Sequence, residues 1–89
     1  MELRFSGQFN RDVDIRNQRI LAEVDKAIEN VENAKNISQI QFLKKLEKYK
    51  VHYRIRVADD YRIGIIIRGT IVWFIRFGHR NDFYQRLFP

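Results

Sequence analysis

The hydrophobic positions divide the chain into a short alternating start, a helical middle and an alternating final third. Residues 1–5 alternate between apolar and polar side chains, which is typical of a first or edge strand. Apolar residues then recur at helical spacing, namely Phe9, Val13, Ile20, Leu21, Val24, Ala27, Ile28 and Val31. The polar run between the first two and the rest predicts a kink or turn near Asn17. Two helices are therefore expected, at about 8–16 and 18–34.

A connecting segment, residues 33–50, links the helices to the final third. Asn33 to Ser38 are residue types that favour a helix end and local backbone hydrogen bonds. Apolar side chains then occupy every third position, at Ile40, Leu43, Leu46 and Tyr49. This spacing is compatible with one or two helical turns or with an irregular packed connector.

The final third predicts three strands, at 51–58, 61–68 and 71–77. Side chains alternate between the two faces of a strand, and one set in each strand is purely apolar. The expected helix-facing sets are Val51, Tyr53, Ile55 and Val57; Tyr61, Ile63, Ile65 and Ile67; and Ile71, Trp73, Ile75 and Phe77. The opposite sets carry Arg54, Arg56, Arg62 and Arg76. The order β-α-α-β-β-β predicts one α+β domain over residues 1–89, with an antiparallel sheet, helices on one sheet face and a short C-terminal segment.

Register decides whether those arginines meet. A three-residue loop at 58–60 pairs Val57 with Tyr61, so that Arg56 faces Arg62 and Arg54 faces Gly64. A three-residue loop at 68–70 would pair Ile67 with Ile71 and place Arg62 opposite Arg76. Gly64, which has no side chain, would leave space for a ligand backbone to approach the sheet.

Composition and charge indicate what such a face could bind. The formal net charge is +6; residues 1–49 hold nine Lys and Arg against eight Asp and Glu, and residues 50–89 hold eight against three. The basic surplus therefore lies in the strands, where arginine, suited to bidentate phosphate contact, predominates. A solvated outer face with scattered cations is the structural alternative. Because the chain has no cysteine and no long apolar run, we expect an intracellular, cytoplasmic protein without disulfide, metal or cofactor, outside the membrane.

The residues after the last strand add groups that could move protons. Gly78 allows the chain to leave the sheet, and His79, Arg80 and Tyr84 follow it. RNA cleavage by the internal 2′-hydroxyl needs a proton acceptor, fixed cations at the phosphate and a proton donor for the leaving oxygen. Arginine can supply only the cation. His79, Tyr84 and His52 are left for proton transfer, and Tyr84 or Phe83 could stack on a base.

The run YRIRVADDYRIGI, followed by FIRFGHRNDFY, resembles the RelE/ParE superfamily of type II toxins, and more closely its RelE branch. The likeness extends over the helices and the LKKLEKY segment. It implies a microbial-ribonuclease-like α+β fold and cleavage of mRNA in the ribosomal A site. It further implies neutralisation by a cognate antitoxin, which we expect to be acidic and to dock on the helices or a sheet edge.

The same resemblance suggests residue roles. The matching positions are Arg54, Arg56, Arg62, His79, Arg80 and Tyr84. Lysine can stand at the first two positions in this superfamily, and the arginines found here do not readily release a proton. We therefore assign proton transfer to His79 with Tyr84, phosphate stabilisation to Arg62 and Arg80, and RNA binding to Arg54, Arg56, Arg76 and His52.

Two other functions fit the same sequence. One is a ParE-like toxin that binds DNA gyrase and has no nuclease activity, because a fold does not fix a function. A pure binder would not require the set of Arg62, His79, Arg80 and Tyr84. The other is a non-catalytic nucleic-acid-binding module, for which the strands offer little support, since their aromatic residues are expected mostly on the helix-facing side.

Overall fold

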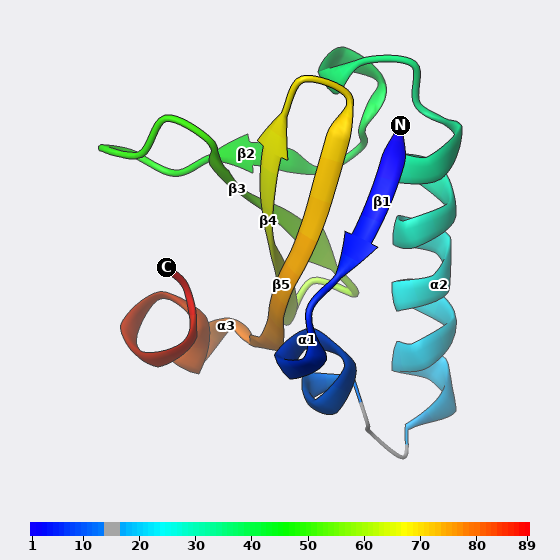
Figure 1. The fold of residues 1–89 in the computed structure, drawn as a ribbon. Coiled ribbons are helices and arrows are strands. Elements are labelled where there is room, and N and C mark those ends of the chain that lie inside the picture. The colour runs from blue at the N-terminus through cyan, green and yellow to red at the C-terminus, as the bar shows by residue number, and fades with distance from the viewer. Residues whose placement is uncertain (14–16) are drawn as a thin grey trace.

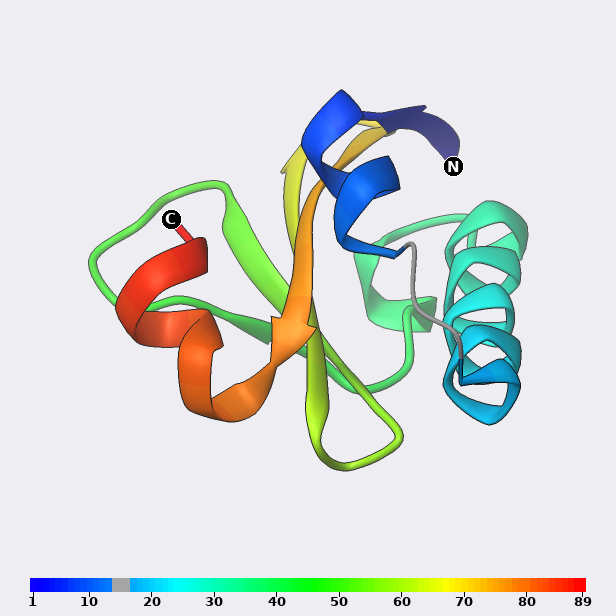
Figure 2. The same ribbon diagram turned by 90° about the horizontal axis from the view of Figure 1, so that it is seen from below.

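The computed structural model describes residues 1–13 and 17–89. A five-stranded sheet separates two helices on one face from a helical C-terminal segment on the other (Figures 1 and 2). The elements are β1 (Glu2–Phe5), α1 (Gly7–Asp12), α2 (Gln18–Asn33), the 3₁₀ turn η1 (Ile37–Gln39), β2 (Leu43–Lys45), β3 (His52–Val57), β4 (Tyr61–Arg68), β5 (Ile71–His79), α3 (Arg80–Asp82) and η2 (Phe83–Leu87). Among the described residues, no helix is both long and apolar enough to cross a membrane.

Side-chain caps set the helix starts. The Ser6 hydroxyl accepts a hydrogen bond from the Phe9 N–H, and the Asn17 side chain accepts from the backbone N–H groups of Arg19 and Ile20. The predicted turn near Asn17 is therefore the N-cap of α2, whose range confirms the second expected helix. The first expected helix is present as α1, and its last part, residues 14–16, lies outside the described residues.

The sheet is mixed, which corrects the expected antiparallel sheet. Its strand order is β1-β5-β4-β3-β2, and β1 pairs with β5 in parallel while the other pairs are antiparallel. After β1 and the two helices the chain forms four strands, β2 to β5, each antiparallel to the one before it, and β5 runs in the same direction as β1 (Figure 1). The connector also contains more structure than the sequence indicated, because it holds η1 and the edge strand β2.

The hairpin between β3 and β4 has the predicted register. Val57 pairs with Tyr61, Arg56 with Arg62, and Arg54 with Gly64. The three-residue loop, 58–60, contains two residues with a left-handed backbone conformation, Ala58 (φ 47°) and Asp59 (φ 57°). Arg54, Arg56 and Arg62 consequently share the sheet face opposite the helices, called the outer face below.

The hairpin between β4 and β5 differs from the prediction. Its loop has two residues, so Arg68 pairs with Ile71, and Arg62 lies opposite Gly78 rather than Arg76. A β-bulge then restores the alternation: Ile65 pairs with Phe74 and Gly64 with Arg76, which leaves Ile75 as the extra residue. Before the bulge the helix-facing positions of β5 are therefore Val72 and Phe74, not Ile71, Trp73 and Ile75. Phe77, after the bulge, faces the helices as predicted.

Each face of the sheet buries its own apolar cluster. The helix-facing core joins both helices to β3, β4 and β5, with Phe9, Val24, Val31, Ile55, Ile63, Ile65, Val72 and Phe74 among its most buried members. The second cluster is small and lies on the outer face, where Leu46, Phe83 and Phe88 pack with Ile66, Ile75 and Leu87. This second cluster attaches the C-terminal segment to the outer face.

Candidate functional site

The C-terminal segment covers part of the outer face at two glycines. A Cβ added to Gly64 would lie 2.5 Å from Cγ of Phe88, and one added to Gly78 would collide with Leu87. The expectation that Gly64 leaves room for a ligand is therefore wrong, because the Phe88 ring occupies that space. The two glycines instead allow the chain's own C-terminal residues to approach the sheet closely.

Two outer-face arginines are held beside this cover. Arg54 donates from Nη1 to the Phe42 carbonyl at 3.0 Å, and Arg62 donates from Nη1 to the carbonyls of Asp59 at 2.6 Å and Tyr61 at 2.9 Å. The Nε atoms of both are buried and, within the described residues, have no hydrogen-bond partner. Burying an unpaired guanidinium N–H costs free energy. The cost is consistent with a face organised around an anionic ligand.

Arg76 is removed from this set by an ion pair. Its Nε donates to Oδ2 of Asp12 at 2.7 Å, and the Phe77 N–H donates to the same oxygen at 3.0 Å. Burial alone would raise the pKa of Asp12, but hydrogen bonds from Arg76, Phe77 and Gln8 outweigh it and bring that pKa below its ordinary value. Arg76 thus joins α1 to β5, and its charge is neutralised there.

His79 and Arg80 gather near the loop between β3 and β4. His79 pairs with Tyr61 across the strands, their rings meet edge to face at 5.5 Å, and its Nδ1 accepts from the Asn81 N–H. The Arg80 side chain lies 3.6 Å from Oδ1 of Asp60. Because directly paired residues share a sheet face, His79 lies with Tyr61 on the helix-facing side. The structure therefore does not bring His79 together with Tyr84.

Tyr84 lines a pocket of about 340 Å³ between the β2–β3 connection and the C-terminal segment. The pocket wall comprises Lys44, Lys45, Leu46, Glu47, Tyr49, Arg54, Tyr84, Phe88 and Pro89. The side chains of this pocket, called the tyrosine pocket below, include three cations and one carboxylate, which favours the binding of an anion. Phe83 is fully buried beneath it, so of the two residues expected to stack on a base only Tyr84 is accessible.

Sequence reasoning missed several residues of the tyrosine pocket. Lys44 pairs with Arg54 across β2 and β3 and so shares the outer face, and the exposed Tyr49 lies in the loop that follows. The sequence indicates β2 only weakly, because a segment of three residues that includes two lysines does not have the pattern of a strand. His52 lies on the same face, its ring between those of Tyr49 at 5.1 Å and Phe88 at 5.4 Å.

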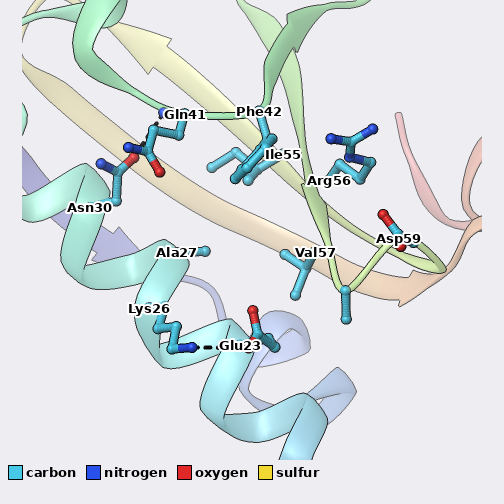
Figure 3. A pocket seen from close by; sticks show the side chains of 11 residues that line it. Glu23, Lys26, Ala27, Asn30, Gln41, Phe42, Ile55, Arg56, Val57 and Asp59 are labelled. Carbon is cyan, nitrogen blue, oxygen red and sulfur yellow. Dashed lines mark hydrogen bonds and ion pairs between the residues drawn. The ribbon is translucent and has the colours of Figure 1, made fainter.

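A second pocket, of about 290 Å³, opens between α2 and the edge of β3 (Figure 3). Ala27, Ile55 and Val57 form its apolar part, and the ion pair of Lys26 with Glu23 borders it at 3.1 Å. Phe42 lies at its opposite wall, is 58% exposed, and has a left-handed backbone with φ 60°. The Arg56 guanidinium lies 5.1 Å from the Phe42 ring centroid, which connects this pocket to the outer face.

Comparisons with known proteins agree with the resemblance found in the sequence. Residues 3–84 match the family described as "ParE toxin of type II toxin-antitoxin system, parDE". The chain is similar to "Toxin RelE3" of Methanocaldococcus jannaschii, with 32% identity over 86 residues that cover 96% of this chain and 97% of the relative.

Solved structures show the same likeness. A chain in the crystal structure of the RelB–RelE antitoxin–toxin complex from Methanococcus jannaschii has a TM-score of 0.77 and 31% identity, over 91% of this chain and 94% of that chain. YafQ from Escherichia coli has a TM-score of 0.73 and 17% identity, over 93% of this chain and 97% of that chain, and supports the fold alone.

Proposed function

Because the chain belongs to the RelE/ParE superfamily of toxins from type II toxin–antitoxin systems, we propose that it is an endoribonuclease that cleaves mRNA, most readily in the ribosomal A site. The observation that supports this most is the tyrosine pocket. It places the Tyr84 phenol and the Arg54 guanidinium in one basic recess, beside an outer face that also carries Arg62. A phosphate bound there would meet fixed cations and a group able to exchange a proton.

In the proposed reaction the 2′-hydroxyl oxygen forms a bond to the adjacent phosphorus while the bond from phosphorus to the 5′ oxygen breaks. The products are a 2′,3′-cyclic phosphate and a 5′-hydroxyl, so one proton leaves the 2′ oxygen and one reaches the 5′ oxygen. Arg54 and Arg62 stabilise the charge that grows on the phosphate, and Tyr84 takes part in proton transfer. Arg80, at the hairpin end, binds the RNA strand beyond the reacting phosphate.

The test is to induce the protein in cells and map the 5′ ends of mRNA, for wild type and three variants. Arg62→Ala should lower cleavage by about 10²–10³-fold, and Tyr84→Phe by about 10²–10⁴-fold. His79→Ala should have a smaller effect because its imidazole contacts Tyr61. The matched control is Arg68→Ala, which removes an exposed arginine from the other end of the same strand. If toxicity persists in every variant and no new 5′ ends appear, the nuclease proposal fails.

The alternative is a ParE-like toxin that binds DNA gyrase and cleaves nothing. It is favoured by the ParE description of the matching family and by the separation of His79 from Tyr84. A supercoiling assay with purified gyrase separates the two proposals. Inhibition by wild type and by Tyr84→Phe alike, without RNA cleavage, would support the gyrase alternative.

We also propose that a cognate acidic antitoxin neutralises this toxin by docking at the pocket between α2 and β3. The chain's net charge favours an acidic partner, and the pocket offers an exposed Phe42 and apolar walls (Figure 3). Phe42→Asp should weaken antitoxin binding, whereas Phe5→Asp, at an exposed phenylalanine outside this pocket, should not. Equal binding by Phe42→Asp and wild type would contradict this location.

A further inference from the structure

A row of five aromatic rings runs across the outer face beneath the tyrosine pocket. Successive ring centroids are 5.1 Å apart from Tyr49 to His52, 5.4 Å from His52 to Phe88, 5.5 Å from Phe88 to Phe83 and 5.1 Å from Phe83 to Tyr84. These distances lie within the range of favourable aromatic contacts. The row joins the β2–β3 loop to the C-terminal segment, although the two are more than thirty residues apart in the chain.

The row is buried in its middle and open at both ends. Phe83 and Phe88 are 0% and 3% exposed, whereas Tyr49 and Tyr84 are 42% and 53% exposed. The buried rings need no function beyond packing, because they form the outer-face cluster. The two exposed tyrosines differ from them, since both line the same pocket and leave ring surface accessible to a ligand.

The tyrosine pocket holds Tyr49 in place and surrounds it with positive charge. Lys45 Nζ donates a hydrogen bond to the Tyr49 carbonyl and so fastens the loop to β2. Lys48, with a left-handed φ of 70°, turns the chain just before Tyr49. Lys44 pairs with Arg54 across the strands and adds a cation beside it on the outer face.

Exposed aromatic rings beside cations are the combination that binds single-stranded nucleic acid, whose bases have open faces for stacking. The volume of about 340 Å³ is near the lower end of small-ligand pockets, which suits a short unpaired stretch rather than a duplex. Tyr84 is already part of the proposed site, and Tyr49 at the other end of the row is unassigned.

We propose that Tyr49 forms a second nucleotide subsite, in which its ring stacks on the base of the nucleotide adjacent to the one bound at Tyr84. Lys44, which lies beside Arg54, binds the phosphate that joins the two nucleotides. This inference rests on the proposed function in one respect, namely that the ligand is single-stranded RNA. It adds a substrate-binding residue that makes no contact with the bond that breaks.

The experiment measures binding separately from cleavage. The probe is a 2′-O-methylated tetranucleotide carrying 2-aminopurine, which lacks the attacking hydroxyl and reports stacking by quenching of its fluorescence. Tyr49→Ala should weaken binding by about 5- to 150-fold and reduce the quenching, whereas Tyr49→Phe, which keeps the ring, should bind within about twofold of wild type. Lys44→Ala should lower the salt dependence of log K by about 0.7, and Lys50→Ala, an exposed lysine outside the pocket wall, should leave it unchanged.

The subsite is contradicted if wild type does not bind the probe, or if Tyr49→Ala binds and quenches it as wild type does. An mRNA cleavage assay on the same variants distinguishes this failure from failure of the proposed function. Cleavage by wild type that is unaffected in Tyr49→Ala removes the subsite and leaves the nuclease. If probe binding depends on Tyr49 but wild type cleaves no mRNA, the subsite is supported and the proposal of nuclease activity fails.

Discussion

On the helix-facing side of the sheet, Ile63, Ile65 and Phe74 are fully buried members of the apolar core. On the outer side, β3 and β4 carry Arg54 and Arg62, whose Nε atoms are buried and, in the part of the chain that the structure describes, unpaired. One side is organised to lower the free energy of folding. The other side keeps polar groups beside a small C-terminal cover, which is the arrangement expected of a surface that binds an anion.

This difference implies that substitutions on the two sides should act on different quantities. A change in the helix-facing core should alter stability and leave activity per folded molecule unchanged. A change among the outer-face arginines should leave stability nearly unchanged and lower activity per folded molecule. Four substitutions test this distinction and are given in order of decreasing expected effect on stability.

Ile63→Ala should have the largest effect on stability. Ile63 is 0% exposed at the centre of the helix-facing core, so the substitution removes buried methyl groups and leaves a cavity. We expect a loss of about 2–5 kcal/mol in the free energy of unfolding. Urea denaturation measures it, with Arg62→Ala as the outer-face comparison. A loss in Arg62→Ala as large as that in Ile63→Ala would contradict the division between the two faces.

Phe88→Ala should cost less, although phenylalanine is larger than isoleucine. Phe88 is buried, but its cluster is small and lies at the end of the chain, where the segment can detach without global unfolding. We expect a loss of about 1–3 kcal/mol. Hydrogen exchange should show faster amide exchange in residues 83–88, while Ile63 stays protected. Equal loss of protection at both places would show that the two clusters unfold as one unit.

Asp12→Asn should cost about 1–2 kcal/mol at neutral pH, because it removes the charged partner of Arg76. Since the pKa of Asp12 is lowered in the folded state, its contribution is complete above the unfolded pKa of about 3.9 and is lost as the pH falls through the folded value. Denaturation curves at several pH values should therefore converge for variant and wild type in acid. A difference between variant and wild type that does not shrink as the pH falls would contradict this assignment.

Arg56→Ala should have the smallest effect on stability, within about 0.5 kcal/mol, because its side chain is exposed. Its effect should appear in RNA binding instead, where the loss of one phosphate contact lowers the salt dependence of log K by about 0.7. Titrations of the 2′-O-methylated probe at several salt concentrations measure this slope. Arg68→Ala is the matched control, and an equal change in it would show that the effect is only one of net charge.

Local patterns were sufficient to predict much of the fold. Alternation and loop length gave β3, β4, their register and the position of three outer-face arginines, while helical spacing and Asn17 gave α2. These features depend on residues close together in sequence. Three of the four predicted helix-facing residues of β5 were wrong, and Phe77 was right. Because Ile71 to Ile75 is apolar in both phases of the alternation, the sequence pattern did not reveal the bulge at Ile75.

The outer face was less predictable because it depends on contacts between distant residues. Asp12 neutralises Arg76 across 64 positions, and Phe88 fills the space over Gly64. Lys44 lies in a three-residue strand that contains two lysines, and Tyr49 lies in the loop after that strand. Local periodicity does not indicate such contacts, so the tyrosine pocket could be identified only from the structure.

The most direct test of the outer face as a ribonuclease site is cleavage of an mRNA on programmed ribosomes, with one 2′-deoxynucleotide at the position cut in the all-ribose message. We expect wild type to cut the all-ribose mRNA there, leaving a 2′,3′-cyclic phosphate, and not to cut the deoxy-substituted position. The Arg62→Ala variant, folded to the same extent as wild type, should cut the all-ribose mRNA far more slowly than wild type does and should not cut the deoxy-substituted mRNA. Cleavage at the deoxy-substituted position, or full cleavage of the all-ribose message by Arg62→Ala, would contradict the proposed site.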